Sequence, residues 1–77
     1  MKVQVFAGLK EYFDATFEVD QNVQSIYGLK QQLIQLKPSS AALLHSCRFA
    51  VNDDFIDDDF ALKASDSIII LPPSSGG

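Results

Sequence analysis

Cysteine, tryptophan, cations and long apolar runs are all scarce in this chain. The single cysteine, Cys47, can form no internal disulfide, so the sequence does not indicate an oxidising compartment. No apolar run approaches the ~18 residues that a membrane-spanning helix requires. Met1 and Lys2 lead into an alternating strand pattern and not into a signal peptide. We therefore expect a cytoplasmic protein without a membrane partner.

The shortage of positive charge narrows the possible partners. Six Lys and Arg residues stand against ten Asp and Glu residues, which gives a net charge of -4 at pH 7. Affinity for phosphate backbones needs clustered cations, so we expect no nucleic-acid partner. Acidic side chains gather at residues 53–59, but their spacing lacks the central Gly and closing Glu of an EF-hand calcium loop. The cluster is more typical of a solvated turn, or of an edge that steers the protein toward a basic partner.

His45 and Cys47 could serve as metal ligands or as a base and a nucleophile. Two side chains do not complete a site of either kind, and a lone cysteine is usually a small core hydrophobe. We therefore expect no metal site and no cofactor bound by this chain.

Apolar and polar residues alternate twice near the N-terminus. Residues 2–6 place Val3 and Val5 on one face of a strand and leave Phe6 on the polar face. Residues 16–20 alternate in the same way, and two such runs close together predict an antiparallel hairpin.

A helical period follows. Apolar residues recur at three-to-four spacing, at Ile26, Leu29, Leu33 and Leu36. This spacing predicts an amphipathic helix that buries these residues. Either Asn22 or Ser25 could cap its N-terminus, and Pro38 should end it at or before Lys37. Gly28 inside the helix suggests that another segment packs closely there.

The C-terminal half predicts a short second helix and three more strands. Ser39 and Ser40 can cap the helix, and strands are expected at residues 48–52, 55–56 and 67–71, with a turn at residues 52–54. The last strand is apolar at both parities, which is typical of the centre of a sheet, and beside the first strand it would run parallel to it. The prediction is one α+β domain over residues 1–71, with a mixed sheet of four to five strands, one main helix and a short second helix.

The last six residues, 72–77, are predicted to form a flexible tail. Gly76 and Gly77 carry no side chains, so the terminal carboxylate can enter a slot that admits only backbone. Such an end suits a carrier whose chemistry lies on its own C-terminus, although a terminus rich in Ser and Gly can also be an idle tail.

Three apolar residues are candidates for a partner surface. Phe6 lies on the polar parity of its strand, and if Phe55 and Leu71 lie near it the three would form an exposed apolar patch. Phe55 and Leu71 could equally belong to the core.

Four segments together resemble a known family. They are Phe6-Ala7-Gly8-Leu9-Lys10-Glu11, Val51-Asn52, Asp66 and Pro72-Pro73-Ser74-Ser75-Gly76-Gly77. In these segments the chain resembles the small, sulfur-carrying subunits of molybdopterin synthases, which are ubiquitin-like proteins. The Pro-Pro-x-Ser-Gly-Gly ending is the most specific segment. Two positions differ from the family pattern, namely Ser65, where Gly is frequent, and Ser74, where an apolar residue is usual.

The resemblance implies a β-grasp fold and a role in molybdenum cofactor biosynthesis. A separate adenylating enzyme would use ATP to activate the carboxylate of Gly77, and sulfur would then replace the adenylate. The resulting thiocarboxylate would enter the large catalytic subunit, in a heterotetramer, and donate sulfur to a cyclic pyranopterin precursor. The chain would thus be the sulfur-donating subunit of a sulfurtransferase without a catalytic site of its own.

The resemblance implies that Gly77 carries the chemistry, with Gly76 before it. The residues expected to contact partners are the candidates for an apolar patch and the start of the tail: Phe6, Phe55, Leu71, Pro72, Pro73, Ser74 and Ser75. Two other functions remain open. The chain could be a ubiquitin-related modifier linked through Gly77 to lysines of other proteins, or a sulfur carrier for another pathway such as thiamine thiazole synthesis.

Overall fold

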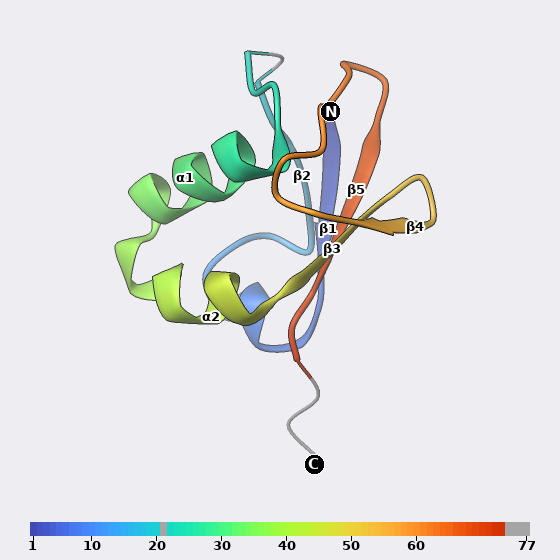
Figure 1. The fold of residues 1–77 in the computed structure, drawn as a ribbon. Coiled ribbons are helices and arrows are strands. Elements are labelled where there is room, and N and C mark those ends of the chain that lie inside the picture. The colour runs from blue at the N-terminus through green and yellow to red at the C-terminus, as the bar shows by residue number, and fades with distance from the viewer. Residues whose placement is uncertain (21, 74–77) are drawn as a thin grey trace.

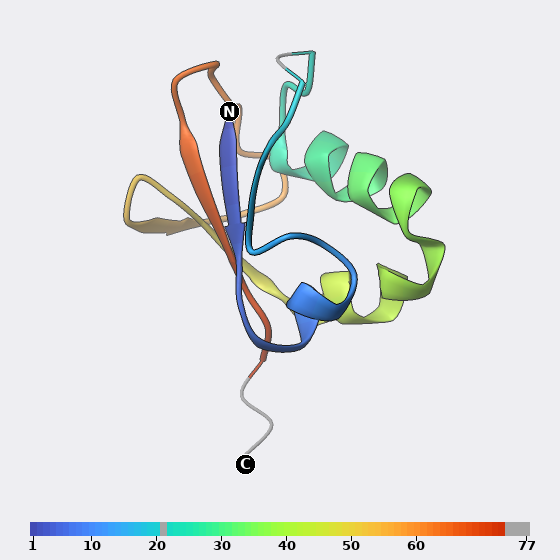
Figure 2. The same cartoon turned by 180° about the vertical axis from the view of Figure 1, so that it is seen from behind.

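A computed structural model describes residues 1–20 and 22–73 of the chain. Its elements are, in order, β1 (Lys2–Val5), the 3-10 helix η1 (Ala7–Glu11), β2 (Thr16–Glu18), α1 (Ile26–Leu36), the 3-10 helix η2 (Pro38–Ser40), α2 (Ala41–Ser46), β3 (Arg48–Val51), β4 (Asp54–Ile56) and β5 (Ser67–Leu71). The strands form one layer, and α1 and α2 cover one of its faces (Figures 1 and 2). Within the described ranges, no helix is long and apolar enough to cross a membrane.

The sheet has five strands in the order β2-β1-β5-β3-β4. β1 pairs antiparallel with β2 and parallel with β5, while β3 pairs antiparallel with both β5 and β4. The predicted hairpin, the central position of the last strand and its parallel alignment with the first are therefore confirmed. The architecture is the expected α+β, ubiquitin-like β-grasp fold, with one main helix and one short helix.

Strand alternation builds the core. Val3 and Val5 of β1 and Ile70 of β5 are fully buried, and Phe49 and Val51 of β3 are nearly so. They point toward the helices because successive side chains of a strand face opposite sides of the sheet. The helix side of this core consists mainly of Ile26, Leu29, Leu33 and Leu44.

Partners outside the helix satisfy the first turn of α1. The hydroxyl of Ser25 accepts a hydrogen bond from the Gly28 amide at 3.1 Å, which confirms Ser25 as the N-cap. The amides of Ile26 and Tyr27 donate to the carbonyls of Phe60 and Asp58 at 3.2 and 2.8 Å. The segment between β4 and β5 is thereby fixed against α1, since a helix start leaves several N–H groups without partners inside the helix.

Three details of the helix prediction are wrong. Leu36 is 63% exposed, whereas Lys30 is only 7% exposed. The buried face of α1 therefore includes Lys30 in addition to the apolar residues Ile26, Leu29 and Leu33. Leu36 is the last residue of the helix and lies outside this face. Gly28 has no close neighbour, because an added Cβ would lie 3.5 Å from the Ser25 hydroxyl and 3.9 Å from Val23. The Ser40 hydroxyl donates to the carbonyl of Lys37 and does not cap α2.

A tight turn and a buried carboxylate position the start of β5. Asn52 and Asp53 join β3 to β4 with φ values of 50° and 76°, and positive φ at both central positions is what a type I′ hairpin turn requires. The side-chain amide of Asn52 donates from Nδ2 to the carboxylate of Asp66 at 3.1 Å. Its Oδ1 accepts from the backbone N–H of Ser67 at 3.3 Å. The segments Val51-Asn52 and Asp66, singled out in the sequence, thus meet in space.

Gly28→Ala should stabilise the protein by up to about 1 kcal/mol, because alanine is the better helix former and its methyl group meets only ordinary contacts. Chemical denaturation of the two proteins measures the difference. Ala42→Gly, at an exposed position of α2, is the control and should lower the free energy of unfolding. A Gly28→Ala protein that is less stable than the wild type would mean that the site does not tolerate a methyl group.

Candidate functional site

The face of the sheet that lies opposite the helices carries a row of four residues that are apolar except for Gln4. Gln4 pairs with Ile69, Ile69 with Ala50, and Ala50 with Phe55, so one residue from each of β1, β5, β3 and β4 lies in line. Phe55, at the outer end of the row, is 61% exposed. Directly opposed side chains on one face lie about 5 Å apart at Cβ. The row therefore runs without a gap across four strands, with Ala50 only 7% exposed between Ile69 and Phe55.

The structure places Phe6, Phe55 and Leu71 on this same face. Phe6 follows β1 in extended conformation, with φ -131° and ψ 161°, and so keeps the parity of Gln4. Leu71, the last residue of β5, is half-buried and pairs with Arg48. Phe55 and Leu71 are consequently surface residues and do not belong to the core. The three do not form one contiguous cluster, because β3 lies between Phe55 and Leu71.

Three residues that belong to this surface are absent from the sequence prediction, namely Arg48, Ala50 and Ile69. Ile69 shares the parity of Leu71 and joins it to the row, and the apolar run of residues 68–71 already contained this signal. Arg48 pairs with Leu71, and its guanidinium carbon lies 5.3 Å from the ring centroid of Phe55. That geometry is a cation–π contact. We call Phe6, Arg48, Ala50, Phe55, Ile69 and Leu71 the sheet-face surface.

The chain leaves this surface at the carboxyl end of β5. Pro72 is half-buried and Pro73 is exposed. Proline has no N–H to donate and fixes φ, so the pair ends strand pairing and stiffens the backbone where it departs from the sheet. The other predicted tail residues, Ser74, Ser75, Gly76 and Gly77, lie outside the described residues.

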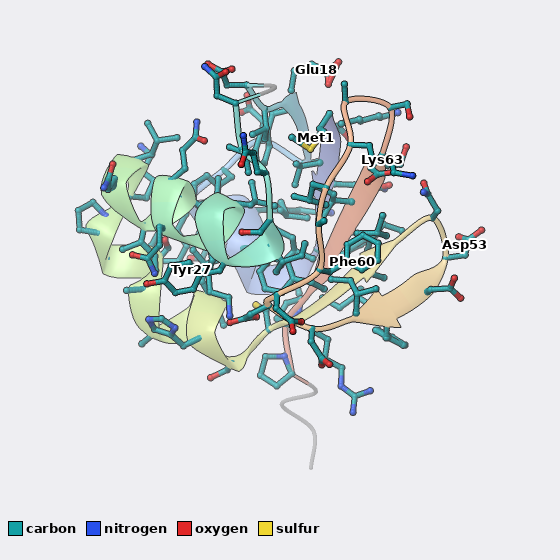
Figure 3. The ribbon with its side chains drawn as sticks, turned by 45° about the horizontal axis from the view of Figure 1, so that its top comes forward. Met1, Glu18, Tyr27, Asp53, Phe60 and Lys63 are labelled. Atoms are coloured by element: carbon teal, nitrogen blue, oxygen red, sulfur yellow. The ribbon has the colours of Figure 1, made fainter. Side chains whose placement is uncertain are left out.

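A groove of about 590 Å³ lies beside the edge strand β4. Lys30 reaches into it from α1 and binds the carboxylate of Asp58 at 2.8 Å, while its ammonium lies 5.2 Å from the ring centroid of Phe49. Asp58 thus pairs with a buried cation and is not simply solvated. Asp53, in contrast, projects outward from the turn between β3 and β4 (Figure 3).

His45 and Cys47 both line this groove. Burial raises the pKa of the Cys47 thiol, and the nearby charge of Lys30 opposes this effect only in part. The thiol also donates to the carbonyl of Leu43 at 3.1 Å. A protonated, hydrogen-bonded thiol is a poor nucleophile. Among residues 1–20 and 22–73, no three His, Cys, Asp or Glu side chains are grouped closely enough to hold a metal ion.

Comparisons with known proteins identify relatives over the whole length. Residues 3–77 match the model of the ThiS family. The chain is 33% identical to a molybdopterin synthase sulfur carrier subunit of Chlamydomonas reinhardtii, with 100% of this chain and 98% of that protein covered. It is 31% identical to the protein of the same description from Dictyostelium discoideum, with coverages of 99% and 94%.

Solved structures agree with this fold. Subunits 1 and 2 of the molybdopterin-converting factor of Helicobacter pylori have been solved as a complex, and a chain of it matches with a TM-score of 0.70 and 31% identity, covering 99% of this chain and 96% of that one. The small archaeal modifier protein 1 of Methanosarcina acetivorans matches with a TM-score of 0.82 and 24% identity, covering 99% and 94%. The second likeness concerns the fold alone.

Iodoacetamide should alkylate Cys47 more slowly in the folded protein than in the same protein in urea at equal pH, because folding keeps the thiol protonated. The raised pKa also predicts that stability is complete at neutral pH and declines as the pH rises past the ordinary pKa of a thiol. Unfolding measured from pH 7 to alkaline pH tests this, with Cys47→Ala as the control that should lack this part of the decline. Equal alkylation rates in both states would contradict the protonated thiol.

Proposed function

The chain belongs to the ThiS family, and from this membership we propose that it is the sulfur-carrier subunit of a molybdopterin synthase. One observation carries the proposal: both curated sulfur-carrier relatives align with at least 99% of the chain. Its sequence ends in the Gly76-Gly77 pair that a carrier terminus needs.

The proposed chemistry starts at the carboxylate of Gly77. A terminal carboxylate has a pKa near 3.5 and is anionic at neutral pH, which makes it a poor electrophile. In the proposed first step a carboxylate oxygen attacks the α-phosphate of ATP on a separate adenylating enzyme, and pyrophosphate leaves. A sulfur nucleophile then attacks the carbonyl carbon and AMP departs, leaving a thiocarboxylate. The ATP belongs to the adenylating enzyme, and this chain needs no cofactor.

To deliver the sulfur, the residues after Leu71 must be long enough to extend into a neighbouring subunit. Six residues follow Leu71, and an extended backbone of that length spans about 20 Å at ~3.3 Å per residue. That distance is enough to enter a pocket of a neighbouring subunit. Pro72 and Pro73 restrict the first part of the path, which lowers the entropy lost on insertion.

The proposed partner is the large catalytic subunit of the synthase, bound through the sheet-face surface in a cytoplasmic heterotetramer. The complex of two molybdopterin-converting-factor subunits from Helicobacter pylori supports this choice, since one chain of it is 31% identical to this protein. The exposed ring of Phe55 beside half-buried Ile69 and Leu71 supports it as well, because buried aromatic anchors carry much of the affinity of interfaces. Within the large subunit, the thiocarboxylate would sulfurate a cyclic pyranopterin precursor.

Other uses of the same terminus remain alternatives. A modifier would form an amide between Gly77 and a lysine of another protein, and a carrier for thiamine thiazole synthesis would pass sulfur to a different acceptor. The likeness to an archaeal modifier at 24% identity concerns the fold and favours neither use. Protein conjugates of this chain in cell extracts would favour the first alternative.

Deleting Gly77 should abolish sulfur transfer without changing stability. The deletion shortens the reach by about 3.3 Å, and a misplacement of 1 Å can lower a rate ~10²-fold when the reaction depends on a near-attack geometry. Appending a residue after Gly77 should be as damaging, because the activated carboxylate would then belong to a bulkier residue. The assay is synthase activity reconstituted with large subunit, adenylating enzyme, ATP and a sulfur donor, compared with thermal melting of the same proteins.

The matched control is Cys47→Ala, which should retain sulfur transfer because the proposed carrier atom is at the C-terminus. Near-normal activity of either Gly77 variant would identify the Gly-Gly end as an idle tail. Loss of transfer in a well-folded Cys47→Ala protein would move the carrier site to the thiol.

Phe55→Asp should weaken binding of the large subunit by about tenfold or more, because it replaces an exposed aromatic ring of the proposed interface with a charge. Stability should change little, since Phe55 is 61% exposed. Phe6→Asp should weaken binding too, but with some loss of stability, because Phe6 is half-buried. Calorimetric titration and thermal melting separate the two effects. Wild-type affinity in Phe55→Asp would remove the sheet-face surface from the interface.

A further inference from the structure

Arg48 is the one charged member of the sheet-face surface, to which β3, β4 and β5 contribute Arg48, Ala50, Phe55, Ile69 and Leu71. Lys2 and Glu18 lie on the same face of the sheet, but they pair with each other at the end of β5 opposite Leu71. Arg48 is also the only arginine of a chain whose net charge is -4. Arg48 thus places a positive charge among apolar neighbours, in a protein whose net charge is negative.

Arg48 has no counter-ion in the described part of the chain. The ion pair found there joins Lys30 to Asp58, and both of these residues line the same groove beside β4 as Arg48 and Phe55. Arg48 instead lies with its guanidinium carbon 5.3 Å from the ring centroid of Phe55. A cation–π contact does not use the N–H groups of the guanidinium. The guanidinium can therefore still donate to an external acceptor.

A partner that covers Phe55, Ile69 and Leu71 must also cover Arg48, which pairs directly with Leu71. Removing a guanidinium from water without a counter-charge is strongly unfavourable, so the covering surface has to supply an anion. A carboxylate fits best, because it can accept two parallel N–H bonds from the fork of an arginine.

We propose that Arg48 is a specificity residue of the sheet-face surface, and that it binds an aspartate or glutamate side chain set within an apolar surface of the partner. The proposal rests on the proposed function, since that partner is the large subunit of the synthase. Arg48 lies opposite Leu71, the last residue of β5, so the ion pair fixes the partner at the point where the chain leaves the sheet. The pair thereby selects a partner that is placed to receive the C-terminus.

The experiment measures binding of the full chain to the large subunit by calorimetric titration at low and high salt. Arg48→Met should weaken binding by about 30-fold or more at low salt, because it leaves the partner's carboxylate buried without a counter-charge. It should also reduce the salt dependence of the affinity. Arg48→Lys should recover only part of the loss, since an ammonium cannot make the bidentate contact or stack in the same way.

Lys63→Met is the matched control, because it removes one positive charge at an exposed position in the segment between β4 and β5. The backbone N–H of Lys63 donates to the carboxylate of Asp66, next to the start of β5, whereas Leu71 is at the end of that strand (Lys63 is labelled in Figure 3). Its affinity should stay within about twofold of the wild type, as expected for a charge outside the interface. Thermal melting of each variant shows that the proteins compared are folded.

The outcomes separate the two proposals. Equal affinities of Arg48→Met and Lys63→Met overturn the ion pair but leave the carrier function in place. Full recovery by Arg48→Lys overturns the bidentate carboxylate. A loss seen only with the adenylating enzyme, or only in self-association of the chain, assigns Arg48 to another occupant and overturns the proposal. A wild-type chain that does not bind the large subunit at all overturns the proposed function together with this inference.

Discussion

The pairing of β5 on both of its edges is the constraint on which the rest of the structure depends. The last strand is held by β1 on one edge and by β3 on the other, so the C-terminal strand is also the central strand. Without it the sheet would separate into two hairpins, β1–β2 and β3–β4, and an isolated two-stranded hairpin is at best marginally stable in water. Leu71, the last residue of the final strand, therefore lies at the end of the central strand of the sheet.

The segment between β4 and β5 links the sheet to α1. It has little regular structure, yet its carbonyls at Asp58 and Phe60 accept from the first turn of the helix, and its Asp58 carboxylate pairs with Lys30. A buried ammonium is tolerable only with such a partner, because desolvation of a lone charge is strongly unfavourable. The ion pair thus fixes the loop against the helix, and through the loop it fixes the approach of the chain to β5.

Strand parity and helix boundaries could be predicted from the sequence because both are local. Val3 and Val5 occupy alternate positions of one strand, which is a pattern within four residues. The Ser25 hydroxyl caps α1 by accepting from the amide three residues later, and Pro38 lacks the N–H that the helix would need to continue. Lys30 and Leu36 could not be assigned correctly, because the buried face of α1 depends on Asp58, 28 residues away. Arg48 was missed for the same reason: its environment comes from Phe55 on β4 and Leu71 on β5. The composition shows that one arginine is present, but it does not show that its side chain lies against Phe55 and beside Leu71.

The two faces of the sheet separate stability from recognition. In β1 and β5 one parity is buried beneath the helices while the other lies on the opposite face, and Leu71 belongs both to the sheet-face surface and to the end of β5. A partner bound to the surface therefore already holds the residue from which the tail starts. Pro72 and Pro73 follow Leu71 directly, and each proline has a fixed φ, so the chain leaves this surface along a restricted path. The central strand thus ties the proposed docking surface to the path of the chain beyond it, because Leu71 belongs to both.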